Sequence, residues 1–68
     1  MTGIVKWYNQ TKGYGFIAPD NGDVDIFVHN SALKAAGLMT LSEGQRVEFE
    51  IVKSKTGKLE AGNLVLPS

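Results

Sequence analysis

The chain has 68 residues and no cysteine, and its seven lysine and arginine residues balance seven aspartate and glutamate residues. Residues 1–68 are therefore expected to form one small domain of marginal stability, without a disulfide framework or a thiolate metal site. The zero net charge excludes binding to nucleic acid by charge alone, and no apolar run is long enough to span a membrane. We expect a cytoplasmic protein, because the amino terminus also lacks the pattern of a secretion signal.

Three strands are predicted in the first half of the chain. Runs rich in β-branched and aromatic residues predict strands over residues 3–9, 14–18 and 24–29. A polar segment ending at Lys12-Gly13 separates the first two strands. Between the second and the third, the sequence PDNGD at residues 19–23 contains an Asn-Gly pair, which favours a tight hairpin.

The next segment breaks the strand pattern. Ser31 can cap a short helical turn over residues 32–36, and Gly37 can end it. Residues 45–53 then alternate apolar and charged side chains, which predicts a fourth strand with one face in water.

A turn with the sequence KTGK at residues 55–58 leads into a last predicted strand, which ends near Leu66. Five short strands in so short a chain favour an all-β fold. The expected architecture is a small antiparallel barrel, closed or nearly closed, because closure removes exposed sheet edges. The helical turn is expected in the loop between its third and fourth strands.

The third predicted strand indicates which way its aromatic residue points. Successive side chains alternate between the two faces of a strand, so Phe27 shares a face with Asp25 and His29. Burying an acid and a histidine without partners would cost several kcal/mol. We therefore expect the aliphatic face of this strand inside the barrel and Phe27 outside.

The second predicted strand, taken alone, does not indicate which of its faces is buried. Ile17 points away from Tyr14 and Phe16, so either Ile17 or the two aromatic side chains lie in the core. If the aromatic side chains lie outward, they extend the surface that begins at Phe27. A bulge in the first strand would add Lys6 and Trp7 to that surface. The core would then be aliphatic and consist of Val5, Ile17, Val24, Ile26, Val28, Leu33, Leu41, Val47, Ile51 and Leu64. The opposite possibility is that the aromatic residues simply form the core.

An outward aromatic surface interleaved with lysine residues suits unpaired nucleic acid bases. Stacking a base on an aromatic side chain contributes about 1–3 kcal/mol, with little dependence on sequence. A duplex hides the faces of its bases, so such a surface would discriminate single strands from double strands. The alternative function is a protein-interaction module whose aromatic face binds a peptide, and the zero net charge fits that alternative.

Three segments resemble bacterial cold-shock proteins. KGYGFI at residues 12–17 and DIFVH at residues 25–29 are similar to the two ribonucleoprotein-type motifs of that family, and LSEGQRVEFEI at residues 41–51 resembles its fourth strand. The resemblance extends over about residues 2–66. It implies an OB-type barrel that binds single-stranded RNA and DNA across its second and third strands. It also implies an ATP-independent RNA chaperone that affects transcription and translation, in cold or stress adaptation.

The resemblance also assigns roles to single residues by matching positions. Base stacking is implied for Trp7, Tyr14, Phe16, Phe27 and His29. Phosphate contacts are implied for Lys6 and Lys12, and less strongly for Lys58. Hydrogen bonds to base edges are implied for Asn9 and Asp25. We expect a monomer with no cofactor and no small-molecule substrate.

The chain departs from the family pattern at one end of this surface. Many members have aromatic residues where this chain has Asn30 and Leu38-Met39, and its last loop contains Gly57-Lys58-Leu59 in place of Lys-Gly-Pro. Two missing stacks at about 1–3 kcal/mol each predict weaker or shorter binding than in a relative with all the aromatic residues. Asn30 can recover part of this loss by hydrogen bonding, which would add a base preference.

Catalysis and metal binding are not expected. The spacing of Asp25, His29 and Ser31 superficially suggests a triad, but residues four apart on a strand are separated by about 13 Å. The sequence contains no phosphate-binding loop of the type that hydrolyses ATP. A single histidine without any cysteine also argues against a metal site.

Overall fold

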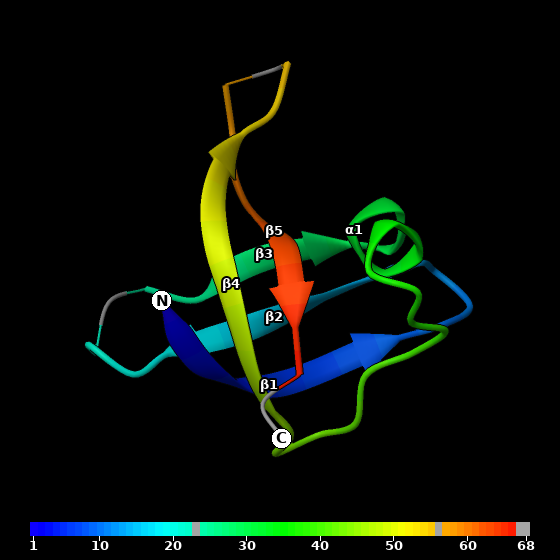
Figure 1. The fold of residues 1–68 in the computed structure, drawn as a ribbon, viewed down its shortest axis with the longest axis horizontal. Coiled ribbons are helices and arrows are strands. Elements are labelled where there is room, and N and C mark those ends of the chain that lie inside the picture. Colours follow the sequence, from blue (N-terminus) through cyan, green and yellow to red (C-terminus); the bar gives the residue numbers. More distant parts are fainter. Residues whose placement is uncertain (23, 56, 67–68) are drawn as a thin grey trace.

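The computed structural model describes residues 1–22, 24–55 and 57–66. Five strands in these residues form a closed barrel in the order β1-β2-β3-β5-β4 (Figure 1). This confirms the expected all-β barrel. The elements in chain order are β1 (Thr2–Asn9), β2 (Tyr14–Pro19), β3 (Ile26–His29), α1 (Asn30–Ala35), β4 (Arg46–Lys53) and β5 (Leu59–Val65).

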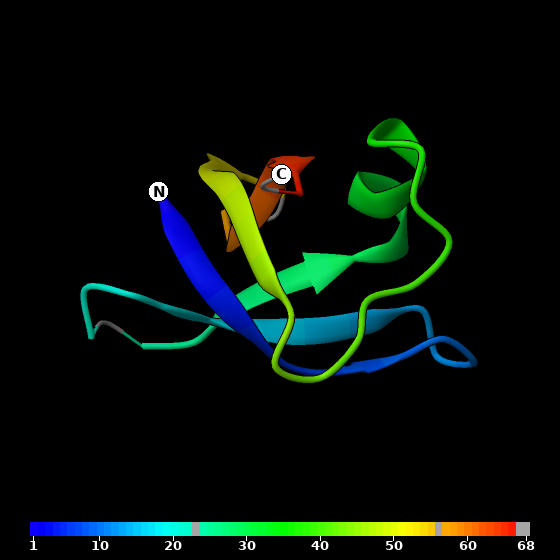
Figure 2. The ribbon, with the colours of Figure 1, turned by 60° about the horizontal axis from the view of Figure 1, so that its bottom comes forward.

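The barrel closes through one parallel contact. All other neighbouring strands are antiparallel, whereas β3 and β5 run parallel and pair at Phe27 and Glu60. The helix α1 lies at the end of β3, and the chain then returns along one side of the barrel to β4 (Figure 2). The strands β2 and β3 therefore lie across the barrel from β4.

A bulge in β1 turns two neighbouring side chains outward. The pairing of β1 with β2 shifts between Val5, which is opposite Ile17, and Trp7, which is opposite Phe16. Val5 is buried, Lys6 and Trp7 are exposed, and Tyr8 packs against the core again. The predicted bulge is thus confirmed, because without the extra residue Val5 and Tyr8 would point to opposite faces.

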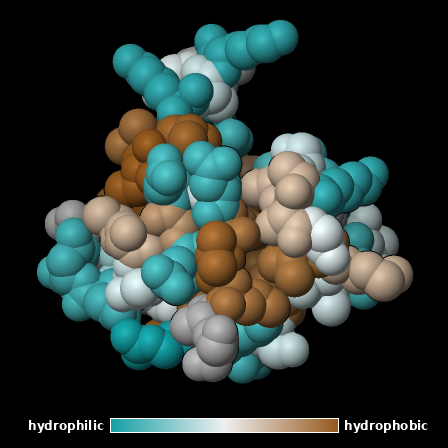
Figure 3. Space-filling model, viewed as in Figure 1, coloured by the Kyte–Doolittle hydropathy of each residue, from teal (hydrophilic) through white to brown (hydrophobic). Residues whose placement is uncertain are grey.

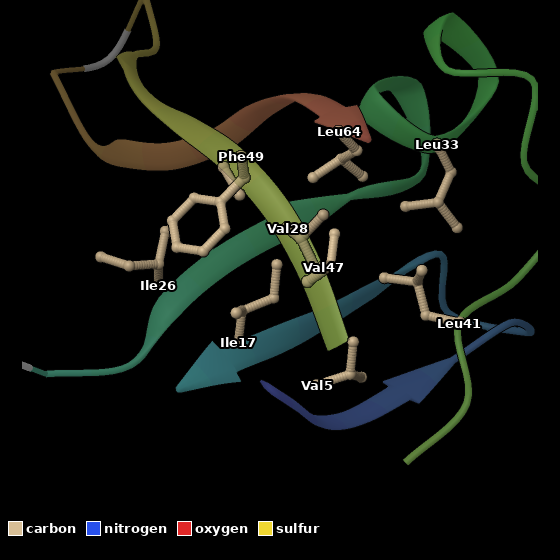
Figure 4. Close-up of a cluster of buried hydrophobic side chains, with 10 residues drawn as sticks. Val5, Ile17, Ile26, Val28, Leu33, Leu41, Val47, Phe49 and Leu64 are labelled. Atoms are coloured by element: carbon tan, nitrogen blue, oxygen red, sulfur yellow. The ribbon is translucent and has the colours of Figure 1, made fainter. Parts of the chain in front are cut away.

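The core of the barrel is mainly aliphatic, and its side chains point inward from several strands and α1 (Figure 4). Ile17 is buried while Tyr14 and Phe16 are not, which resolves the arrangement of β2. The aromatic residues of β2 and β3 therefore lie outward. The buried cluster comprises Val5, Ile17, Ile26, Val28, Leu33, Leu41, Val47, Phe49, Ala61 and Leu64.

Two residues expected in the core are exposed instead. Val24 is 81% exposed because β3 begins only at Ile26, so strand alternation does not extend back to it. Ile51 is 39% exposed. The pairing of β4 with β5 shifts between Glu48 and Glu50, and the hairpin beyond this shift projects past the end of the barrel (Figure 1). Ile51 lies on that projecting part, where little covers it.

The prediction that Ser31 caps the helix is wrong. The cap is His29, whose Nδ1 accepts a hydrogen bond from the backbone N–H of Ser31 at 3.2 Å. The helix starts earlier than expected because a histidine nitrogen takes the role that a hydroxyl usually takes. Gly37 follows the helix with a φ of 77°, as predicted for a helix stop. Asp23 and Thr56, which belong to the two predicted turns, lie outside the described residues.

Candidate nucleic-acid interface

Strand pairing places the predicted stacking residues on one outer face of the barrel. The bulge puts Trp7 opposite Phe16, Phe16 is opposite Phe27, and Tyr14 is opposite His29. Residues that are directly opposite in adjacent strands lie on the same face. We call these five residues, from β1, β2 and β3, the aromatic platform.

The rings of the platform touch one another in an unbroken series. The ring of Trp7 has its centroid 5.4 Å from that of Phe16 and 5.6 Å from that of Tyr14. Phe27 lies 5.6 Å from Tyr14, 5.9 Å from Phe16 and 6.2 Å from His29. Several of these contacts are edge-to-face, a favoured geometry for aromatic pairs. Each ring is thus held by its neighbours while one side remains accessible.

A shallow cavity of about 350 Å³ lies on the platform. Its walls are Tyr14, Phe16, Phe27 and the side chain of Lys58. Lys58 reaches this place because it precedes β5, and β5 is the neighbour of β3 in the barrel. The structure therefore joins a cation from the end of the chain to three aromatic rings from its first half.

Gly15 allows β1 and β2 to approach closely beneath the platform. A Cβ atom added at Gly15 would lie 2.7 Å from the Cα of Tyr8 and nearer still to the carbonyl oxygen of Trp7. No other residue fits between the two strands without moving them. The glycine between Tyr14 and Phe16 thus brings Trp7 into contact with both rings.

Lys6 and Asp25 lie together as an ion pair. The Lys6 Nζ is 3.0 Å from the Asp25 Oδ2, and both side chains are partly exposed. An exposed pair of this kind contributes at most about 1 kcal/mol, so it can open at little cost. A phosphate could then replace the carboxylate as the partner of Lys6.

Asn9 and Lys12 belong to the turn between β1 and β2. The Oδ1 of Asn9 accepts a hydrogen bond from the backbone N–H of Lys12 at 2.9 Å. The side chain of Lys12 is exposed. The carbonyl of the Asn9 side chain therefore shapes this turn, and its amide nitrogen takes no part in this hydrogen bond.

Asn30 is separate from the platform. It lines a second cavity of about 280 Å³, together with Tyr8, Gln10, Lys34, Leu38 and Met39. Gln10 and Lys34 were not predicted as site residues. A polar residue type alone does not mark either position as a binding site. The two residues are distant in the sequence and come together only because the loop after β1 and the helix α1 meet in the folded chain.

A second exposed apolar region covers the β4–β5 hairpin. Figure 3 shows it below a hydrophilic tip. Its exposed side chains include Ile51, Val52 and Leu59, on the part of the hairpin that projects past the barrel. This region lacks the aromatic rings that distinguish the platform.

The described residues contain no group of three or more histidine, cysteine or acidic residues that could hold a metal ion. His29 Nδ1 lies 3.1 Å from the Ser31 Oγ, whereas Asp25 pairs with Lys6. Nor do these residues form any helix with the length and apolar character needed to cross a membrane.

Comparison with known proteins places the chain in a family. Residues 1–67 match the model of the 'Cold-shock' DNA-binding domain. The chain belongs to the cold-shock domain family. It is 56% identical over 64 residues to a probable cold shock protein of Sinorhizobium fredii, with 93% of each chain covered. It is 52% identical over 66 residues to the cold shock-like protein CspE of Escherichia coli, covering 97% of this chain and 96% of that protein.

Membership of the cold-shock domain family makes this chain a nucleic-acid-binding protein and not an enzyme. The family match extends over the platform, the second cavity and the β4–β5 hairpin alike. A third relative, the cold shock protein CspA of Rhizobium meliloti, is 55% identical over 64 residues, covering 93% of each chain.

Proposed function

We propose that this cold-shock domain binds unpaired RNA and DNA by stacking successive bases on the aromatic platform. The observation that carries the proposal is the unbroken series of ring contacts from Trp7 through Phe27 to His29 on one outer face. Bases stack on exposed aromatic side chains whatever their identity, at about 1–3 kcal/mol each. Several stacks provide useful affinity even though the net charge is zero.

The lysine residues around the platform guide the strand and set its orientation. Lys58 lines the cavity on the platform, and Lys6 lies on the β1 bulge beside Trp7. Lys12 lies in the turn that leads to Tyr14. Three phosphate contacts at about −0.7 each predict a slope near −2 for log K against log salt concentration. Salt should thus weaken binding only modestly.

The protein acts as an RNA chaperone by mass action and needs no ATP. A ligand that binds only the open form of a hairpin favours opening by RT ln(1 + [L]/Kd), the relation used for ligand-linked unfolding of proteins. Opening RNA structures in this way would affect transcription and translation, in cold or stress adaptation. We propose that the protein does so as a monomer in the cytoplasm.

Trp7 is the only tryptophan and lies on the platform, so its fluorescence reports binding directly. We would titrate the protein with a short unpaired pyrimidine oligonucleotide and with the matching duplex, at low and high salt. We expect strong quenching by the single strand alone, with the shallow salt slope given above. A response to neither nucleic acid would contradict the proposal. It would favour the alternative, a peptide in the largely apolar cavity, whose affinity should not fall with salt.

A further inference from the structure

The second cavity lies where the platform ends. Asn30, one of its walls, directly follows His29 in the chain, and its backbone N–H donates to the carbonyl of Gly13 at 2.8 Å. Gly13 in turn precedes Tyr14, the partner of His29 across the two strands. A strand that lies on the platform and continues past His29 therefore reaches this cavity next.

The walls of the cavity are formed before any ligand arrives. Tyr8 and Leu38 pack against the core, and the backbone N–H of Leu38 donates to Leu33 at 2.8 Å. The side chain of Asn30 lies against Gly13, where an added Cβ would be only 2.9 Å from its Nδ2. With about 280 Å³, the cavity is near the lower limit for small-molecule sites, roughly 300 Å³. It suits a single flat group.

Three polar side chains point to the kind of group that fits. Gln10 and Asn30 carry amides, which both donate and accept hydrogen bonds, whereas the Nζ of Lys34 only donates. Within the residues that the structure describes, none of the three side chains is engaged by another side chain. Their hydrogen-bonding groups are thus available to a ligand that offers both donors and acceptors.

We propose that this cavity binds one unpaired guanine of the strand on the platform, an inference that rests on the proposed function. Guanine carries two adjacent acceptors, O6 and N7, which suit the donors of Lys34. Its N1–H and N2 amino group can donate to the amide oxygens of Gln10 and Asn30. Adenine would place its N6 donor beside N7, opposite the lysine. A pyrimidine, with one ring fewer, would cover less of Tyr8 and Leu38.

The first experiment locates the base in the bound strand. We would measure the affinity of the protein for a short oligothymidylate and for a set in which one guanine replaces each thymine in turn, using Trp7 fluorescence. We expect guanine to raise the affinity about tenfold at one position, from one well-placed pair of hydrogen bonds, and to change it little at the others. Oligonucleotides with adenine or cytosine at that position should not show the increase.

The second experiment assigns the preference to this cavity. Lys34→Gln should reduce the guanine preference to about twofold or less, because glutamine cannot supply the same charged donors. Lys55→Gln removes the same charge from an exposed residue that lines neither cavity, and it should leave the preference intact. Asn30→Ala is a second test, since it removes a wall group without changing the charge. Circular dichroism would verify that each variant is folded.

The outcomes separate this inference from the proposed function. If the oligothymidylate itself does not bind, the proposed function fails. If it binds and no position favours guanine, or another base is preferred there, the guanine site alone is wrong. A guanine preference that survives in both Lys34→Gln and Asn30→Ala would overturn its assignment to this cavity.

Discussion

Three phenylalanine residues show how position on a strand determines the role of a side chain. Phe49 is 1% exposed and belongs to the core, whereas Phe16 and Phe27 are partly exposed on the outer face. The residue type is the same, so hydrophobicity alone does not distinguish them. Their neighbours do, because Phe27 alternates with the buried Ile26 and Val28. Removing a platform ring should therefore weaken binding more than folding.

Phe27→Ala is expected to weaken single-strand binding by about 1–3 kcal/mol, the contribution of one stacked base, or roughly 5- to 150-fold. The change in the free energy of unfolding should be clearly smaller than for Phe49→Ala, which should lose about 3–5 kcal/mol as a buried phenylalanine. Fluorescence titration and urea denaturation measure the two quantities. Val65→Ala, at an exposed position outside the platform, is the matched control. Equal affinity of Phe27→Ala and the unchanged protein would contradict the stacking role.

At the scale of elements, the junction of β3 and α1 gives His29 two tasks. Its ring is the last of the platform, 6.2 Å from Phe27, and its Nδ1 caps the helix through the Ser31 N–H. Since Nδ1 accepts this hydrogen bond, the neutral ring carries its proton on Nε2. The Nε2–H is then the group that can donate to a base or a phosphate. The start of the helix thereby fixes the orientation of a platform residue.

Two substitutions of His29 should separate these tasks. His29→Ala loses both the ring and the cap, so binding should fall and the free energy of unfolding should drop by about 1 kcal/mol. His29→Asn also loses the ring, but asparagine is a good helix cap. Its binding should fall as far while its stability stays close to that of the unchanged protein. Thermal denaturation and oligonucleotide titration provide the comparison. Equal destabilisation by both substitutions would show that the cap contributes nothing.

Strand and turn signals in the sequence were sufficient to predict the barrel, whereas the resemblance to cold-shock proteins was needed to decide for the outward platform. Strand alternation placed Phe27 outside but left two arrangements of β2 open. It failed where an element ends or where strands pair irregularly. Val24 lies before the first residue of β3, and Ile51 lies beyond a register shift that only the pairing with β5 reveals. Of the second cavity, the sequence singled out Asn30 and Leu38-Met39 but not Gln10 and Lys34, which come together through the fold and not through any local pattern.

At the scale of the whole molecule, charge and aromatic surface are distributed unequally. Glu48 and Glu50 are exposed on β4 together with Arg46 and Lys53, and this strand of mixed charge lies across the barrel from β2 and β3 (Figure 2). Lys6, Lys12 and Lys58 lie on or beside the platform strands. The aromatic rings and these three lysine residues therefore share one side of the molecule, although the net charge is zero. A nucleic acid strand should approach from the platform side, because the lysine residues there attract its phosphates.

The chaperone role predicts a limit on which RNA hairpins open. At a free protein concentration 100 times the Kd, binding to the open strand shifts the equilibrium by about 2.7 kcal/mol. A hairpin with a stability of about 2 kcal/mol should then open without ATP, whereas one of about 5 kcal/mol should stay closed. RNA hairpins labelled with a fluorophore and a quencher would show this, and Phe27→Ala, which binds more weakly, should open the weak hairpin only at a higher protein concentration. Single-strand binding without opening of the weak hairpin would refute the role.

A protein that works by mass action must stay dispersed at concentrations well above its dissociation constant. Many β proteins fail this requirement, because the free backbone groups of an edge strand recruit further copies into aggregates. Here each of the five strands has a neighbour on both sides of it around the closed barrel. The closed ring thus leaves none of these five strands as an open sheet edge, while the aromatic residues remain on its outer face. The topology that displays the platform therefore also limits edge-to-edge association between copies of the chain.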